Sequence, residues 1–156
     1  MSAESVEKFM LLLKQSPSGA VFNPWWEVDN ENDIGRNAPA IRRKQLRAYL
    51  QERLRTATLA VIGEAVGYRG GHFSGIPMTS ERLLLGRSNK IRLKRTDIIH
   101  NLKPQRSSKP EKCPGGFSEP TATIVWGTIL GLGLKPNQFV PGMHSRGTRS
   151  ILAAAC

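Results

Sequence analysis

Residues 59–77 read LAVIGEAVGYRGGHFSGIP, and this stretch decides the fold. Its first four residues are apolar and are followed by a glycine, which is typical of a buried strand in a parallel sheet. A glycine-rich loop follows and leads to a helix through residues 83–85, for which Thr79 or Ser80 is a suitable N-cap. The stretch therefore predicts a strand, a long loop and a helix in succession.

Three further helices are predicted around this unit. Apolar residues recur at helical spacing over 5–13, over 39–54 and over 121–134, and the last two segments have a proline near their first turn. Residues 103–116 are polar and rich in proline and glycine, which predicts a loop. This order of elements predicts an α/β fold: a three-layer α/β/α sandwich with a short parallel sheet.

The composition fits one domain. The chain has 156 residues, of which 39% are hydrophobic, and no apolar run approaches the ~20 residues that cross a bilayer. Two cysteines, Cys113 and Cys156, cannot build a disulfide framework or a four-thiolate metal site. The acidic residues between 27 and 33 lack the glycine and terminal glutamate of a calcium loop and indicate a surface loop. We expect a monomeric cytoplasmic protein with no secretory signal, no membrane partner and no cofactor.

The net charge of +11 is unevenly distributed. Residues 82–112 hold ten basic residues against two acidic ones and so contribute +8. A smaller basic cluster, Arg42, Arg43, Lys44 and Arg47, falls on a predicted helix. Such clusters neutralise phosphates and favour nucleic acid as a partner, and the apolar residues between the basic ones indicate a folded surface. The alternative is a solvated basic face or a flexible segment without a partner.

The loop after the strand is the candidate site, because ligands in open α/β sheets bind beyond the carboxyl ends of the strands. Five glycines in the thirteen residues 63–75 allow backbone amides to approach a ligand closely. Their spacing matches neither a dinucleotide fingerprint nor a phosphate loop. The reactive side chains of this region are Glu64, Tyr68, Arg69, His72, Ser80 and Glu81. The alternative is a tight glycine-rich turn without chemistry.

Two segments resemble motifs of a known family. Residues 60–67, AVIGEAVG, are similar to a strand leading into G-E-x-P-G, and residues 75–81, GIPMTSE, to a G-x-P-F-[TV]-G-[DR] segment that closes the same pocket. Both motifs belong to the uracil-DNA glycosylase superfamily, in one of its bacterial branches. Residues 23–26 (NPWW) and 115–123 (GGFSEPTAT) are also similar to members of that branch, so the resemblance extends over roughly residues 20–140.

The resemblance implies base excision repair, in which a deaminated base is flipped out of DNA and its N-glycosidic bond is hydrolysed. It implies that Glu64 or Glu81 positions the water or stabilises the sugar cation. The residues implied to bind the base, through backbone amides or by contact with its ring, are Ala65, Val66, Gly67, Tyr68, Phe73 and Met78. The residues expected to contact DNA are Arg69, Ser80, Arg82, Arg92, Lys94 and Arg95.

Three positions depart from the family pattern. Val66 stands where the family has proline, Met78 where it has a stacking phenylalanine, and Ala65 where several branches have Asp or Asn. The four-cysteine iron–sulfur cluster of other branches is not implied, because this chain has only two cysteines.

The end of the chain departs further. The family continues into a motif similar to W-N-A-F-x-x-H-P, whereas residues 141–148 read PGMHSRGT. Read from the third base of the proline codon, the codons that can encode these residues permit WNAFAWH. We therefore predict a family-like domain over residues 1–140 and an out-of-frame tail over residues 141–156. The alternative is a genuine, divergent tail.

Three functions stay open. The first is a uracil-DNA glycosylase-like protein that is weak or inactive because the Asn and His motifs are absent, with apolar surface exposed on the helix over 121–134. The second is a non-catalytic nucleic-acid-binding remnant that keeps only the basic face. The third is an unrelated phosphate-ester or nucleotide-binding α/β protein, which needs a carboxylate cluster near the strand ends.

Overall fold

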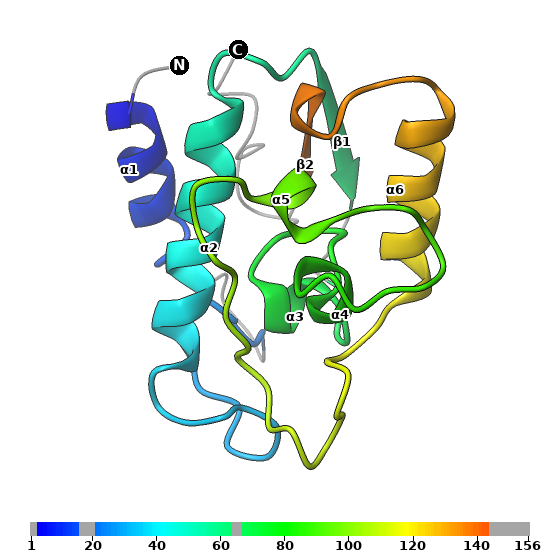
Figure 1. The fold of residues 1–156 in the computed structure, drawn as a ribbon. Helices are drawn as coiled ribbons and strands as arrows, with labels where there is room; N and C mark the ends of the chain where they lie inside the picture. Colours follow the sequence, from blue (N-terminus) through cyan, green and yellow to red (C-terminus); the bar gives the residue numbers. More distant parts are fainter. Residues whose placement is uncertain (1–2, 16–20, 64–66, 144–156) are drawn as a thin grey trace.

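The computed structural model describes residues 3–15, 21–63 and 67–143 (Figure 1). These residues form a mixed α/β structure that is mostly helical and holds a two-stranded parallel sheet. In chain order the elements are α1 (Ala3–Leu12), α2 (Ala38–Arg53), β1 (Leu59–Gly63), α3 (Gly71–Ser74), α4 (Glu81–Leu84), α5 (Arg95–Ile98), α6 (Pro120–Gly131), the 3-10 helix η1 (Pro136–Gln138) and β2 (Phe139–Met143).

The strand pair lies between α2 and α6 (Figure 1). The strands run in parallel, with Leu59 opposite Phe139. From α2, the Tyr49 hydroxyl donates to the Phe139 carbonyl over 3.2 Å. From α6, the Trp126 ring packs edge-on against the Phe139 ring, with centroids 4.6 Å apart. Phe139 therefore joins the two helices to the sheet.

Strand β1 has the predicted bounds but not the predicted burial. Its Leu59 and Ile62 side chains are 37% and 55% exposed. Within the described ranges β2 is the only strand that pairs with it, so one edge of β1 has no strand neighbour. The prediction that β1 is buried is wrong, because the strand forms an edge of the sheet and two of its apolar side chains are exposed.

Helix α2 confirms the helix predicted over residues 39–54. Pro39 stands in the first turn, where backbone N–H groups have no intrahelical acceptor, so the missing N–H of proline costs no hydrogen bond. Leu46, Tyr49 and Leu50 recur at helical spacing and are buried. The helix therefore supplies one wall of the core.

Arg42 on α2 is a buried hub and not part of a basic surface. Its guanidinium pairs with Asp33 through Nη1–Oδ1 and Nη2–Oδ2 distances of 2.6 and 2.9 Å, and both side chains are fully buried. The same group donates to the carbonyls of Pro24 and Glu27 and to Ser107 Oγ. The predicted basic cluster therefore loses Arg42, and Asp33 lies in the interior instead of a surface loop. Each charge compensates the burial of the other.

Helix α6 begins at Pro120, one residue before the predicted start, and ends at Gly131, before the predicted end at residue 134. Trp126 and Ile129 are buried on its inner face. Its outer side is apolar as well, since Ile124 and the following Leu132 are 66% and 68% exposed. The apolar surface expected on this segment is present.

The helix predicted after the glycine-rich loop is a single turn, α4. Ser80, one of its two predicted caps, accepts a hydrogen bond from the Leu83 N–H over 3.3 Å. The other, Thr79, accepts one from the Trp126 indole N–H over 3.1 Å. Gly86 ends this segment with a φ of 69°. None of the described helices is long and apolar enough to span a membrane.

Strand β2 crosses the domain boundary predicted at Val140. Residues 141–143 continue the strand in register with β1. The first three residues of the predicted tail therefore belong to the sheet. Its remaining residues, 144–156, lie outside the described residues.

Candidate functional site

The glycine-rich loop follows the carboxyl end of β1, and its residues 67–80 are described. Met78 reaches back to the strand, because a Cβ added to Gly63 would lie 2.5 Å from Met78 Cε. Met78 has a φ of 49°, the only positive φ among the described non-glycine residues. Such backbone strain is concentrated at functional sites. The predicted site residues Glu64, Ala65 and Val66 lie outside the described residues.

Five aromatic side chains form a connected cluster at this loop, which we call the aromatic cluster: Phe22, Tyr68, His72, Phe73 and Phe117. The Tyr68 ring stands edge-on to His72 at 5.8 Å, and His72 stacks on Phe22 at 4.5 Å. Phe73 contacts His72 and stacks on Phe117 at 4.2 Å. Tyr68 is 71% exposed and Phe73 only 2%. Tyr68 is therefore open to a stacking partner, whereas Phe73, predicted to stack on a base, belongs to the core.

His72 is the buried centre of the aromatic cluster. Its Nε2 lies 3.4 Å from Asp29 Oδ2, within ion-pair range but without hydrogen-bond geometry. Burial lowers the pKa of His72, the Arg42 charge lowers it further, and Asp29 and Asp33 oppose the shift. Burial also raises the pKa of Asp29, but hydrogen bonds from Asn32 and Glu31 outweigh it, so that pKa is lowered. A neutral imidazole beside a carboxylate follows at neutral pH.

Glu81, for which a catalytic role is predicted, is buried, and both of its carboxylate oxygens accept hydrogen bonds. Its Oε1 accepts the backbone N–H groups of Ser107 and Ser108 over 2.8 and 3.0 Å. Its Oε2 accepts the Ser108 hydroxyl and the Phe117 N–H. A general base needs a lone pair that water can reach. Through these hydrogen bonds, the carboxylate connects residues 107–108 and residue 117 to the start of α4.

The predicted DNA contacts nearest the loop have different environments. Arg69 is exposed. Ser80 is buried and its hydroxyl caps α4, so it does not present itself to a phosphate. Arg82 is half-buried and donates to the Gly116 carbonyl over 3.1 Å and to Cys113 Sγ over 3.6 Å. Of the three, only Arg69 is placed for the predicted contact.

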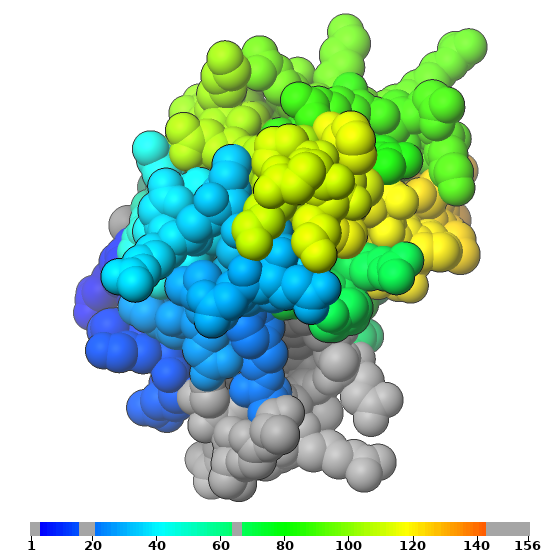
Figure 2. All heavy atoms as spheres, turned by 90° about the horizontal axis from the view of Figure 1, so that it is seen from below, coloured from blue at the N-terminus to red at the C-terminus, as the bar shows by residue number. Residues whose placement is uncertain are grey.

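Five of the ten basic residues in the run between residues 82 and 112 make hydrogen bonds or ion pairs within the molecule. Arg106 donates to the carbonyls of Cys113 and Pro114, and Arg87 also donates to Pro114. Lys109 Nζ donates to the carbonyls of Asn30 and Glu31. Figure 2 shows the chain around residues 30 and 110 side by side on one face of the molecule. Arg82 and Lys112 also make such bonds, and these five cations hold neighbouring loops together.

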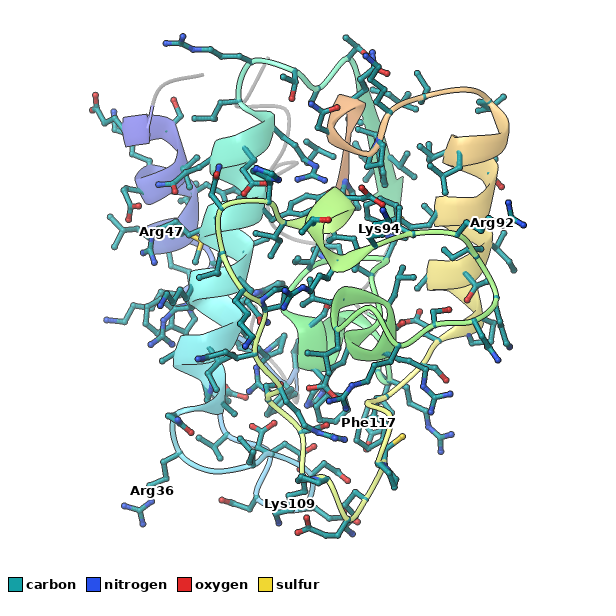
Figure 3. The ribbon with its side chains drawn as sticks, viewed as in Figure 1. Arg36, Arg47, Arg92, Lys94, Lys109 and Phe117 are labelled. Carbon is teal, nitrogen blue, oxygen red and sulfur yellow. The ribbon has the colours of Figure 1, made fainter. Side chains whose placement is uncertain are left out.

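The other five cations of the run are exposed and make no side-chain hydrogen bond or ion pair within the described part of the chain. They are Lys90, Arg92, Lys94, Arg95 and Lys103, which we call the free cations. Figure 3 shows Arg92 beside α6 and Lys94 at the start of α5, away from Arg36 and Lys109 at the other end of the view. The predicted contacts Arg92, Lys94 and Arg95 all belong to this group.

Glu119 is a site residue that the sequence reasoning missed. It immediately precedes α6, and its carboxyl group lies against Gly67 and Gly70, where a Cβ would overlap it. Its Oε2 is buried without a hydrogen-bond partner among the described residues. Burial raises the pKa of Glu119, opposed by hydrogen bonds from the Thr121 side chain and the Gly71 N–H. Gly67 and Gly70 were the available sign that another group lies close to the loop, but nothing local in the sequence connects these glycines with Glu119.

A surface hollow of about 380 Å³ lies away from this loop, between α2 and residues 101–102. Its charged side chains already have partners: Glu52 accepts the N–H groups of His100 and Asn101, and Arg47 pairs with Glu7 at 2.7 Å. Only Lys44 is without such a partner in the described ranges. The hollow is therefore a weaker candidate than the loop.

Within residues 3–15, 21–63 and 67–143, no group of three or more His, Cys, Asp or Glu side chains is placed to hold a metal ion. Comparisons with protein-family models, with curated proteins and with solved structures found no match to this chain.

Proposed function

We propose that this chain binds DNA as a uracil-DNA glycosylase-like protein, stacking an unpaired base on Tyr68, and that it excises the base weakly or not at all. The observation that carries the proposal is the exposed Tyr68 ring, which stands edge-on to the buried His72 in the loop after the carboxyl end of β1. Stacking on an aromatic side chain contributes about 1–3 kcal/mol per base. The proposal includes the three-layer sandwich of that superfamily.

The free cations support a polyanionic partner. They are five positive charges without internal partners in the described part of the chain, so phosphates can engage them without breaking an existing bond. Arg69 adds a sixth exposed cation next to Tyr68. A backbone-contacting surface and a base-stacking ring together fit a single strand better than a small anion.

A non-catalytic binding protein is the second candidate, and the environment of Glu81 favours it. Of the two carboxylates predicted to act in catalysis, Glu64 lies outside the described residues and Glu81 accepts four hydrogen bonds in the interior. In an excision assay on a uracil-containing single strand, release of uracil would favour the first candidate, since a non-catalytic binding protein releases none.

Binding is tested with single-stranded oligonucleotides that differ in one uracil. Tyr68→Ala should weaken binding about 10-fold, as expected for one lost stacking contact, while Tyr68→Phe should retain affinity. Ile124→Ala removes a similarly exposed apolar side chain elsewhere and should have no effect. Equal affinity of the wild type and Tyr68→Ala would remove base stacking from the proposal.

The electrostatic part is tested with the triple variant Arg92→Ala, Lys94→Ala, Arg95→Ala. The magnitude of the negative slope of log binding constant against log salt concentration should decrease by about 2, since each phosphate contact on a single strand contributes roughly 0.7. The matched control replaces three exposed cations elsewhere, Arg36, Lys44 and Arg55, with the same change in net charge. An identical salt slope in both variants would show that net charge, and not the free cations, attracts DNA.

A further inference from the structure

The carboxyl group of Glu119 occupies the space that side chains would fill at Gly67 and Gly70. A Cβ built on Gly67 would overlap both carboxyl oxygens, and one built on Gly70 would overlap Oε2. Both positions therefore have to be glycine for the acid to lie where it does. The contact joins the glycine-rich loop to the residue before α6, across about fifty residues of sequence.

We propose that Glu119 is a positioning residue, whose carboxyl group holds the loop of residues 67–71 against the start of α6 and thereby sets the place of the Tyr68 ring. The consequence for base stacking rests on the proposed function. The position of the loop can be measured without DNA, so the two ideas can fail separately.

The neutral carboxyl group is the form that suits this place. Oε2 is buried and has no donor within the described ranges, so an ionised carboxylate would carry charge that is not compensated. Two groups donate to the carboxyl, the Gly71 N–H and the Thr121 side chain. The ionisable side chains of the facing loop are Tyr68, Arg69 and His72, helix α6 has none, and the segment before it carries Lys112 and Cys113. Deprotonation should therefore loosen the loop.

The test is amide hydrogen exchange of the full chain, read on peptides that cover residues 67–73 and corrected for the intrinsic rate at each pH. In the wild type, protection of these amides should decrease about 10-fold between about pH 5 and pH 8, as local opening becomes easier. Glu119→Gln, which is always neutral, should stay protected across this range. Glu119→Ala should be unprotected throughout, while peptides from α2 report that the variant is folded.

Glu111→Gln is the matched control, because Glu111 is exposed and its side chain makes no hydrogen bond or ion pair in the described part of the chain. It should retain the wild-type pH profile. The inference is overturned if Glu119→Gln shows the same pH dependence as the wild type, or if Glu119→Ala leaves the loop protected in a folded chain.

A double-mutant comparison tests the geometry itself. Gly67→Ala should displace the carboxyl group and reduce loop protection about as much as Glu119→Ala does. In the Glu119→Ala background the same glycine change should add no further loss, because the overlapping group is gone. Additive losses would show that the two positions act independently and would overturn the inference.

Discussion

Glu81→Gln separates a structural from a catalytic role for the carboxylate that begins α4. The glutamine oxygen can keep the Ser107 and Ser108 N–H groups, which Glu81 Oε1 now accepts. The amide nitrogen then takes the place of Oε2, where it faces the Phe117 N–H, a second donor. In the variant, the two hydrogen bonds from Ser107 and Ser108 therefore have a neutral acceptor, and the third bond is replaced by two N–H donors that face each other.

Hydrogen bonds to charged groups contribute about 1.5–3 kcal/mol each, and the remaining neutral bonds about 1 kcal/mol. Glu81→Gln should accordingly lower the free energy of unfolding by about 2–4 kcal/mol, a large part of the roughly 5–15 kcal/mol of a typical domain. At about 2–4 °C per kcal/mol for a chain of this size, the melting temperature should decrease by roughly 5–15 °C. Urea and thermal unfolding measure both quantities.

Glu111→Gln serves as the reference, since an exposed side chain without such bonds should change stability by less than about 0.5 kcal/mol. The reasoning is refuted if Glu81→Gln melts like the wild type. Wild-type stability together with a loss of uracil release would return Glu81 to a catalytic role.

Two further predictions concern the same region. Burial lowers the pKa of His72, so the unfolded chain binds a proton there more tightly than the folded chain does. The free energy of unfolding is therefore highest above about pH 6.5 and decreases as the pH falls below that value. Urea midpoints at about pH 8 and pH 5 should therefore differ less in His72→Phe than in the wild type, and replacing the exposed His100 by Gln should not reduce the difference. Gly75→Ala should cost about 3 kcal/mol or more, because Gly75 has a φ of 78° and its Cβ would lie 2.6 Å from the Arg42 carbonyl oxygen. Gly133→Ala, with a φ of 76° and open space around the Cβ, should cost only about 1–2 kcal/mol, and equal losses would contradict the overlap.

Local patterns in the sequence predicted the elements well. The apolar run closed by Gly63, the periodic residues of α2 and the proline that begins α6 all mark elements that the structure contains. Each signal lies within a few residues of the element it predicts, and propensity and capping act over the same range. The parallel sheet was predicted from the order of the elements, and the two strands do run in parallel.

Burial and pairing were beyond such patterns. The apolar residues of β1 suggested an interior strand, but burial depends on how many strands the sheet has. Glu81 stood at the start of a helix after a glycine-rich loop, and nothing local showed that residues 107, 108 and 117 would donate to it. Glu119 was missed for the same reason, because its glycine partners lie about fifty residues earlier in the sequence.

The buried guanidinium of Arg42 has a consequence for the order of folding events. It bonds to Pro24, 18 residues before it, and to Ser107, 65 residues after it. The segments around Pro24 and Ser107 lie outside the helices and strands, so they have no regular secondary structure to form early. Closing the longer separation costs more chain entropy and needs α2 already formed to present the arginine. Both stretches should therefore gain their native structure together in one late step, and a chain that opens at Arg42 should lose both at once.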